Sequence, residues 1–268
     1  MENNIINKML TKDDLVNIFR KVGISNGMIV EVHSSMSQMG FIIGGAQTFN
    51  DALIETLGYN GTIIMPLQCS YNEEPSLLSN PPISFDLYKD YRKNYPAFDP
   101  LDSEATCMGK IVENLRRREK AIISYHPNCA FVAIGKYAKL LCNYQNIEFP
   151  FDDSSPLGRL YELKASCLLV GVDYSNMTSL HLAEYKSEVR PISINGAAIK
   201  EASIRKWEKY LEYDIDSSDG FNEIGERLEK KGLVNTLELE NTKLKLLRVD
   251  VAIDEGIAYY KDRMKYYN

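Results

Sequence analysis

The sequence lacks the features that would place the protein in a membrane or an oxidising compartment. Its first ten residues, MENNIINKML, contain no long apolar core of a secretory signal peptide. No run reaches the ~18 apolar residues that a membrane helix requires. The five cysteines are an odd number without a C-x-x-C pair, and several stand in apolar runs, where free cysteine behaves as a small hydrophobic residue. These absences predict a reduced, cytoplasmic protein with no membrane partner and no structural zinc site.

A basic surface is missing as well. There are 37 Asp and Glu against 31 Lys and Arg, for a net charge of −6, whereas a nucleic-acid-binding protein needs a basic footprint. The acidic excess is compatible with a cationic small substrate. The 268 residues, 44% apolar and 25% charged, are enough for one large α/β domain or two small ones.

The order of apolar segments in the first quarter of the chain predicts an α/β fold. Residues 11–22 and 46–57 have the apolar spacing of helices. Residues 28–32 and 62–65 are short buried strands, the second of them expected to end at Pro66. A strand, a helix and a second strand in this order predict the beginning of a parallel sheet.

A different composition follows between residues 67 and 104, where five prolines stand among many aromatic residues. A long irregular segment inside a compact domain is often functional, so this excursion is interpreted as a lid or substrate-binding loop, with a plain surface insertion as the alternative. Further on, 189–194 and 198–202 are expected to form a hairpin around Asn195-Gly196, and 233–239 to pair with 244–249.

The stretch 167–185, CLLVGVDYSNMTSLHLAEY, combines a buried strand, a polar turn and a short helix capped by Thr178-Ser179. His181 and Glu184 have i, i+3 spacing and share a helix face. Ligands collect beyond the carboxyl ends of strands in open α/β sheets, so His181 is a candidate general base with Glu184 as its partner. A hydrogen-bonded structural histidine, with Glu184 paired to Lys186 or Arg190, fits the pattern as well.

The loop that follows the first strand, HSSMSQMG at 33–40, is rich in small donors and precedes two further glycines at 44 and 45. Backbone N–H groups and hydroxyls in such a loop can bind an anionic group. The loop matches neither a dinucleotide fingerprint nor a Walker loop.

Three histidines, His33, His126 and His181, are all that the chain contains. An unperturbed pKa of ~6.5 makes each a candidate base. With a carboxylate they would also suit the zinc site of a metal-dependent hydrolase, although the H-E-x-x-H spacing is absent. A cysteine acyl-enzyme on Cys129, near His126 in sequence, is another alternative.

Eight separated blocks, taken in order, resemble the family of aminoglycoside 3-N-acetyltransferases, the antibiotic acetyltransferases outside the GNAT superfamily. The resemblance covers about residues 10–230. The blocks are VHSSMSQMG at 32–40, GG at 44–45, GTIIMP at 61–66, PAFDP at 96–100, MG at 108–109, SYHP at 124–127, SPLGRL at 155–160, and 168–184, which ends in TSLHLAE.

The resemblance implies a single domain over residues 1–268, an α/β/α sandwich with a largely parallel or mixed sheet, that uses acetyl-CoA as co-substrate and no metal. In the family, an amine of an amino sugar attacks the thioester directly while a histidine takes its proton. By position His181 is that base and Glu184 its partner. Residues implied at the cofactor are His33, Ser34, Ser35, Met36, Gly40, Ser124 and His126, and those at the acceptor are Tyr71, Asp99 and Thr178.

The expected partners are CoA and a small-molecule amine, and the expected assembly is a monomer or homodimer. Where the family usually has an arginine and a serine around the SYHP block, this chain has Ile123 and Ala130, so the acceptor is either an aminoglycoside or a sugar or nucleotide sugar of polysaccharide synthesis. A family member that binds ligand without turnover is a further alternative. Acidic residues that suit a polycation, or a solvated surface equally well, are Asp99, Asp102, Asp214, Asp216 and Asp219.

Overall fold

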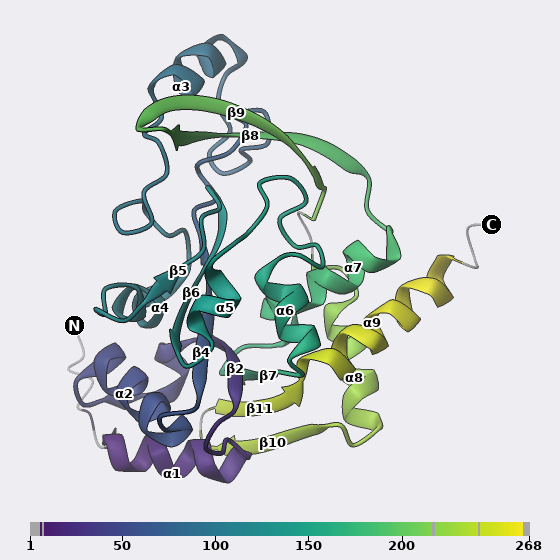
Figure 1. Cartoon of the computed structure of the whole chain (residues 1–268). Coiled ribbons are helices and arrows are strands. Elements are labelled where there is room, and N and C mark those ends of the chain that lie inside the picture. Colours follow the sequence, from purple (N-terminus) through teal and green to yellow (C-terminus); the bar gives the residue numbers. More distant parts are fainter. Residues whose placement is uncertain (1–5, 7, 216–217, 241, 265–268) are drawn as a thin grey trace.

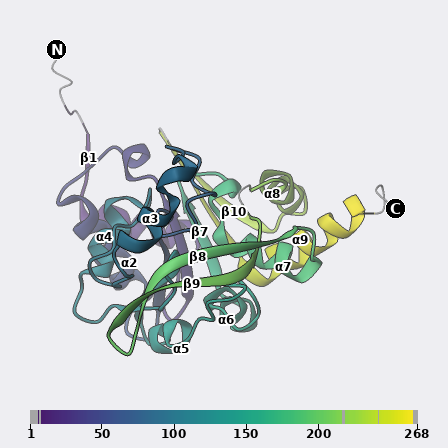
Figure 2. The same ribbon diagram turned by 90° about the horizontal axis from the view of Figure 1, so that it is seen from above.

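The computed structural model describes residue 6 and residues 8–215, 218–240 and 242–264. They form an α/β fold around a mixed central sheet, with helices on both faces and a separate hairpin above one end of the sheet (Figures 1 and 2). The sheet has the order β10-β11-β7-β2-β4-β6-β5, and these strands are Val234–Leu239, Thr242–Arg248, Ser166–Val170, Ile29–Ser34, Thr62–Gln68, Cys129–Gly135 and Ile122–Ile123.

The centre of the sheet is parallel and its flanks are antiparallel. Strand β2 lies parallel to β7 on one side and to β4 on the other, while β6, β5, β11 and β10 join by antiparallel pairing. The predicted parallel start and the predicted pairing of the last two strands are therefore confirmed. The carboxyl ends of β2, β4 and β7 meet at one edge, because parallel neighbours run in the same direction.

One face of the sheet is covered by helices α1, α2 and α4. Helix α1 begins with a capping box in which Thr11 and Asp14 bond each other's backbone amides. Its buried Phe19 meets Phe49 of α2 edge to face, with ring centroids 5.3 Å apart. These helices are Lys12–Val22, Gly45–Leu57 and Gly109–Arg116, and a short parallel pair beside them is β1 (Met9–Leu10) with β3 (Phe41–Ile42).

The other face carries a second hydrophobic cluster, which includes Phe131, Phe151 and Leu169. Ser155 caps α6 through its hydroxyl, with proline in the first turn. None of the helices in the described part of the chain, on either face, has the length and apolar character needed to span a membrane. The helices of this face are α5 (Ala138–Cys142), α6 (Pro156–Glu162), α7 (His181–Ser187), α8 (Phe221–Lys230) and α9 (Val249–Met264).

Two predicted strand boundaries are wrong. Pro66 does not end its strand, because β4 continues to Gln68 in register with β6. The pairing of β4 with β2 ends at Ile64. From there on β4 has β6 as its partner on one side alone, and the missing N–H of a proline is tolerated at such an edge position.

The hairpin does not turn at Asn195-Gly196. Strand β8 (Ile192–Glu201) runs straight through these residues, and the turn to β9 (Ile204–Tyr213) lies at Ala202 and Ser203, which have φ of 46° and 68°. A Cβ on Gly196 would lie 2.6 Å from Nε1 of Trp207, so this glycine makes room for the indole on the neighbouring strand rather than for a turn.

The excursion between β4 and α4 packs against this hairpin. It contains the 3-10 turn η2 (Phe85–Leu87) and helix α3 (Tyr88–Asn94), which lie beside β8 and β9 at the top of Figure 1. Asn72 donates to the carbonyl of Ala198 at 3.0 Å and accepts from its amide at 2.8 Å. The amide of Phe98 bonds the same carbonyl at 2.9 Å. The hairpin and the excursion therefore form one unit above the carboxyl edge of the sheet.

Candidate active site

A cavity of about 220 Å³, here called the strand-edge cavity, lies where the parallel strands end. Its walls come from the last residues of β2 and β4, from the start of α4 and from the turn before α7. This is the position at which open α/β sheets bind ligands. The lining residues are Val32, His33, Ser34, Pro66, Gln68, Cys107, Met108, Val112, Ser175, Asn176, Thr178 and His181.

His181 opens α7 and is held by a buried carboxylate. Its Nδ1 lies 2.6 Å from Oε2 of Glu184, which is fully buried. The other oxygen of Glu184 accepts from Nε of Arg190 at 2.6 Å. Burial alone would lower the pKa of Arg190, but the charge and hydrogen bond of Glu184 raise it. Both contacts considered for Glu184, with His181 and with Arg190, are thus present, while Lys186 pairs with Asp153 instead.

Two aromatic rings fix the plane of the His181 imidazole. Phe151 stacks on it with centroids 5.5 Å apart and 9° between the planes. Phe221, the first residue of α8, approaches at 4.9 Å. Because Nδ1 is directed at Glu184, Nε2 is the nitrogen available to a substrate. The carboxylate keeps the imidazole in one tautomer, which is the arrangement that suits a general base.

A second and larger cavity, here called the hairpin cavity, has a volume of about 620 Å³ and shares His181 with the first. It lies between the excursion and the β8–β9 hairpin. Three carboxylates line it, Glu73, Glu212 and Asp214. Its other lining residues are Gln68, Ser70, Tyr71, Ser76, Leu77, Leu78, Ser79, Asn80, Thr106, Cys107, Asn128, Cys129, Phe151, Ser193, Asn195 and Ile215.

Glu212 has a perturbed carboxyl group. Burial raises its pKa to about 7, a hydrogen bond from Asn195 opposes the rise, and the charge of Asp214 adds to it. Asn195 is buried, donates to Glu212 at 2.6 Å, and accepts from the amide of Glu74 at 2.9 Å. This asparagine therefore joins β8, β9 and the excursion at the wall of the hairpin cavity.

The residues predicted to bind the cofactor in the loop after β2 do not all line the strand-edge cavity. Ser34 lines the strand-edge cavity. Ser35 donates its amide to the carbonyl of Val170 at 2.9 Å and precedes the 3-10 turn η1 (Met36–Met39). Met36 packs against the hydrophobic cluster on the α1 face. Gly40 has φ of 76°, with no neighbouring atom within 4 Å of a Cβ there, so the backbone conformation is what favours glycine.

Ser124 and His126 are fully buried and do not line either cavity. Ser124 donates to Gln145 at 2.6 Å and accepts from the amide of Phe131 at 2.8 Å. Nδ1 of His126 accepts from the amide of Cys129 at 2.9 Å, and its Nε2 donates to the carbonyl of Ile147 at 3.1 Å. Burial lowers the pKa of His126 to about 4. Both side chains hold the loop before β6, and their implied place at the cofactor stays a prediction.

The residues predicted at the acceptor are also divided. Tyr71 lines the hairpin cavity and Thr178 the strand-edge cavity. Asp99 lies outside both, caps its own loop through the amide of Leu101 and lies 3.5 Å from Nζ of Lys200. Of the other acidic candidates, Asp214 lines the hairpin cavity, Asp219 accepts from Arg263, Asp102 is exposed, and Asp216 is outside the described residues.

The alternative chemistries find little support. The three histidines do not converge, because both ring nitrogens of His126 are bonded to backbone groups. Among the described residues, the close group of metal-ligating side chain types that forms contains His33 but neither His126 nor His181. Burial raises the pKa of the Cys129 thiol well above its ordinary value, which disfavours the thiolate that a nucleophile requires.

Sequence reasoning missed Glu31, Glu212 and Asn195. Glu31 is the one charged residue in the otherwise apolar segment 28–32, and this signal was visible in the sequence. The sequence contains no local signal for Glu212 and Asn195. They contact each other through the pairing of β8 with β9, and Asn195-Gly196 was predicted to be the turn of that hairpin.

Comparisons with known proteins agree with the resemblance. A sequence model of the family described as "Aminoglycoside 3-N-acetyltransferase" matches residues 32–261. The chain is 33% identical over 245 residues to the SPbeta prophage-derived aminoglycoside N(3')-acetyltransferase-like protein YokD of Bacillus subtilis, covering 91% of this chain and 90% of YokD. The crystal structure of YokD superposes with a TM-score of 0.91, covering 95% of this chain and 94% of that chain.

Two further similarities point the same way. The chain is 32% identical over 223 residues to aminoglycoside N(3)-acetyltransferase VIII of Streptomyces fradiae, covering 79% of this chain and 73% of the relative. The crystal structure of aminoglycoside acetyltransferase AAC(3)-Xa, 27% identical, has a TM-score of 0.86 and covers 94% of this chain and 93% of its own.

Proposed function

The chain belongs to the aminoglycoside 3-N-acetyltransferase family, and on this premise we propose that it transfers an acetyl group from acetyl-CoA to an amino group of an amino sugar. The transfer is direct, with His181 as general base and no metal. The acceptor is an aminoglycoside or a sugar or nucleotide sugar of polysaccharide synthesis. The observation that carries the proposal is the position of His181, which lines both the strand-edge cavity and the hairpin cavity.

The strand-edge cavity is assigned to the thioester end of acetyl-CoA. Ser34, at the end of β2, supplies a hydroxyl donor there. The positions of Ser35, Met36 and Gly40 in the loop that follows make them neighbours of the bound cofactor. In support, AAC-IIIb, which has the same fold at 21% identity and a TM-score of 0.86, was solved as a binary complex with CoASH.

The hairpin cavity is assigned to the amine. Its volume of about 620 Å³ lies in the range typical of small-molecule sites. Glu73, Glu212 and Asp214 give it negative charge, which attracts a cationic amine, and Tyr71 offers a ring for a sugar face. Placed between the two cavities, Nε2 of His181 is positioned to take a proton from the amine as that nitrogen attacks the thioester carbonyl.

The chemistry follows from the surroundings of His181. An amine is cationic near neutral pH and must lose one proton to solvent before it can attack. A second proton leaves the nitrogen as it attacks, and a base with a pKa near ambient pH is efficient at taking it. As the C–N bond forms and the C–S bond breaks, the electron pair goes to sulfur and the amine proton to Nε2. The imidazolium that forms is stabilised by Glu184 at 2.6 Å. The hydrogen bond from Nε of Arg190 holds the carboxyl group of Glu184 in place.

A thiol-release assay tests the proposal. The protein is incubated with acetyl-CoA and, in separate arms, with aminoglycosides, free amino sugars and nucleotide-linked amino sugars, with and without EDTA. We expect amine-dependent release of CoASH in at least one arm, unchanged by EDTA. Acetyl-CoA binding without thiol release on any of the amines would identify a binding protein instead. Loss of activity with EDTA and rescue by zinc would favour the metal-dependent hydrolase.

A further inference from the structure

Three of the described residues line both the strand-edge cavity and the hairpin cavity. They are Gln68, Cys107 and His181. In the proposed function the thioester lies in the first cavity and the amine in the second, so the carbonyl carbon and the attacking nitrogen meet where the cavities meet. Reacting atoms have to come within about 3–3.5 Å of each other. Side chains at this junction therefore lie next to the carbonyl oxygen during transfer.

The sheet directs the side chain of Gln68, the last residue of β4, toward the junction. Alternate residues of a strand share a face. Ile64 and Pro66, on the same face as Gln68, belong to the hydrophobic cluster on the α7 side and to the wall of the strand-edge cavity. The register partner of Gln68 is Cys129 of β6, which lines the hairpin cavity. The pairing of β4 with β2 ends at Ile64, so β2 does not cover Gln68.

The side-chain amide of Gln68 is free to bind a ligand. Its backbone carbonyl accepts from the amide of Thr106 at 2.7 Å. Within the described part of the chain, its side-chain amide has no hydrogen-bond partner. Gln145 differs, because its side-chain amide makes hydrogen bonds of 2.6, 2.9 and 3.0 Å to neighbouring residues. The fold uses the amide of Gln145 and leaves that of Gln68 for a bound molecule.

Of the three side chains at the junction, Gln68 has the chemistry of an oxyanion donor. Its amide carries two N–H donors, and since this group does not titrate, it donates at any working pH. Nε2 of His181 accepts the amine proton in the proposed reaction. The thiol of Cys107 is a weak donor. A neutral N–H donor for the carbonyl oxygen is therefore supplied by Gln68.

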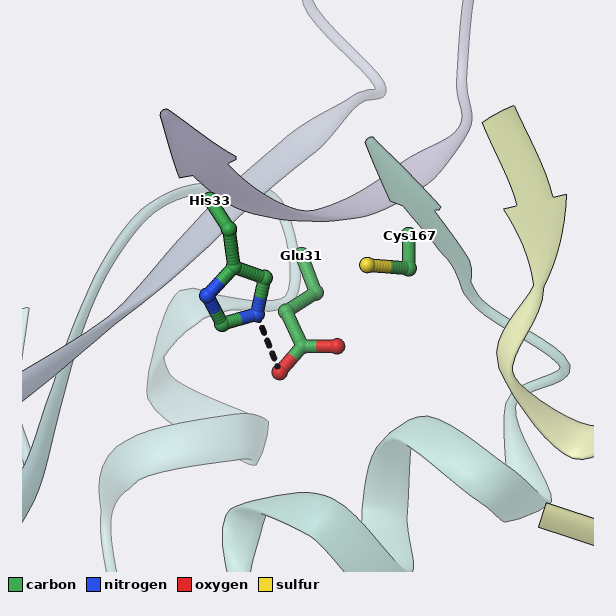
Figure 3. A group of neighbouring side chains, drawn as sticks. All are labelled: Glu31, His33 and Cys167. Atoms are coloured by element: carbon green, nitrogen blue, oxygen red, sulfur yellow. Dashed lines mark ion pairs between the residues drawn. The ribbon is translucent and has the colours of Figure 1, made fainter. Parts of the chain in front are cut away.

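His33 is the other imidazole of the strand-edge cavity, and its contacts lie below the junction. Figure 3 shows its ring beside Glu31, with Nε2 3.1 Å from Oε1 of that residue. The amide of Thr178 donates to the same nitrogen at 3.4 Å. These contacts connect β2 to the turn before α7. His33 lines the strand-edge cavity but not the hairpin cavity, so it is not one of the junction residues.

We propose that Gln68 is a catalytic residue whose side-chain N–H donates to the carbonyl oxygen of the thioester. The inference rests on the acetyl transfer proposed above. As the C–N bond forms, an electron pair of the C=O bond moves onto the oxygen, where the N–H of Gln68 stabilises it. The pair returns to carbon as the C–S bond breaks and sulfur takes the bonding pair. Gln68 gives up no proton, and His181 receives the proton of the amine.

The kinetic test uses Gln68→Leu, which removes the donor at similar size, and Gln68→Glu, which keeps the shape and replaces the donor with a carboxylate. The exposed Gln47→Leu of α2 is the matched control. With an active acceptor we expect kcat to fall by ~10²–10³ for Gln68→Leu, as for the loss of one oxyanion donor. The fall should be at least as large for Gln68→Glu, because a carboxylate repels the charge that develops on the oxygen.

Acceptor KM, and CoASH affinity measured by calorimetry, should change by less than ~3-fold in Gln68→Leu. A wild-type kcat in Gln68→Leu would overturn the assignment. So would a wild-type kcat in Gln68→Glu, because a carboxylate can accept a hydrogen bond from the amine but cannot donate one to the carbonyl oxygen. Either variant alone is sufficient, so the test stands if a thermal melt shows that one of them does not fold.

A spectroscopic measurement tests the same contact without an acceptor. Acetyl-CoA labelled with ¹³C at the carbonyl is bound to each protein, and its carbonyl stretch is recorded by difference infrared spectroscopy. A hydrogen bond weakens the C=O bond, so we expect a lower frequency in the wild type and Gln47→Leu than in either Gln68 variant. Equal frequencies in all four proteins would overturn the inference and leave the proposed acetyl transfer intact. Failure of the wild type to bind acetyl-CoA at all would overturn both.

Discussion

The strand-edge cavity and the hairpin cavity meet at His181 but are built in different ways. The first is formed by the ends of β2 and β4, whose positions are fixed by backbone pairing within the central sheet. The second is formed by the excursion and the β8–β9 hairpin, which are joined by hydrogen bonds that include those of Asn72 and Asn195. In the proposed function the strand edge carries the chemistry, and the hairpin wall, like many binding loops, carries recognition of the acceptor.

This difference predicts a division of kinetic effects. Changes at the strand edge should reduce kcat with every acceptor, because the reacting atoms lie there. Changes at the hairpin wall should mainly raise KM for the amine and leave CoASH affinity unchanged, because we assign the acceptor and not the cofactor to this wall. Four substitutions test this division, in order of decreasing expected effect.

The largest effect is expected at the junction. His181→Ala should lower kcat by ~10²–10⁴ through loss of the general base, with a much smaller change in CoASH affinity. Lys186→Ala on the same helix, which removes an ion pair with the exposed Asp153, is the matched control. Thiol-release kinetics and a thermal melt measure both variants. Near-normal turnover in His181→Ala would remove this residue as the base and leave the two cavities without a shared general base.

The second effect is expected where the hairpin is tied to the excursion. Asn195→Ala leaves the amide of Glu74 and the carboxyl of Glu212 without their partner. A buried polar group left unsatisfied costs about 1–3 kcal/mol. We expect a lower free energy of unfolding by that amount and a raised acceptor KM, with CoASH affinity unchanged. The exposed Asn143→Ala is the control. Weakened CoASH binding in Asn195→Ala would contradict the independence of the two walls.

The strand edge could be predicted from the sequence better than the hairpin wall, because the two are built in different ways. Residues 28–32 and 167–172 were readable as buried strands, and the i, i+3 spacing of His181 and Glu184 was readable as one helix face. Local patterns were sufficient there, because the sheet edge is assembled from consecutive apolar runs. The resemblance then added the roles of the loop residues, of which Ser34 lies at the cavity and Ser124 and His126 lie in the interior.

The hairpin wall could not be predicted in this way. Asn195-Gly196 has the composition of a turn, yet its glycine accommodates Trp207 and its asparagine bonds residues from two other segments. The true turn at Ala202 and Ser203 contains no glycine, asparagine or proline, although both residues have positive φ. Long-range contacts decide the register here, and local sequence does not encode them. The burial of Glu31 was not predicted either. It is explained by the contact with His33, which the structure shows on the same face of β2.

A third prediction concerns the charge of the hairpin wall. The pKa of Glu212 is about 7 instead of the ordinary 4.5, so this carboxyl group is neutral below pH 7 and anionic above it. For a cationic acceptor, KM should therefore fall as pH rises through about 7, and Glu212→Gln should remove this part of the profile. Glu208→Gln on the same strand is the control. A pH profile of KM that is unchanged in Glu212→Gln would separate this carboxylate from the acceptor.

The same raised pKa has a consequence for stability with a definite sign. Below about pH 4.5 Glu212 is protonated in both the folded and the unfolded chain. The contribution of the protonated carboxyl group to the free energy of unfolding is then fully present. Between about 4.5 and 7 the unfolded chain releases the proton first, so stability falls as pH rises through this window. Chemical denaturation at several pH values should show a flatter dependence for Glu212→Gln than for the wild type.

The smallest effect is expected at Asp99, where the resemblance and the geometry differ most. Asp99 lies outside the hairpin cavity, is half-exposed, and interacts with the amide of Leu101 and with Lys200. Exposed pairs of this kind contribute about 0–1 kcal/mol, so Asp99→Asn should change stability by no more than that and acceptor KM by less than ~2-fold. Asp102→Asn is the control. A large rise in acceptor KM for Asp99→Asn would mean that the acceptor extends beyond the hairpin cavity to the part of the excursion around Asp99, and the acceptor site would then include this residue.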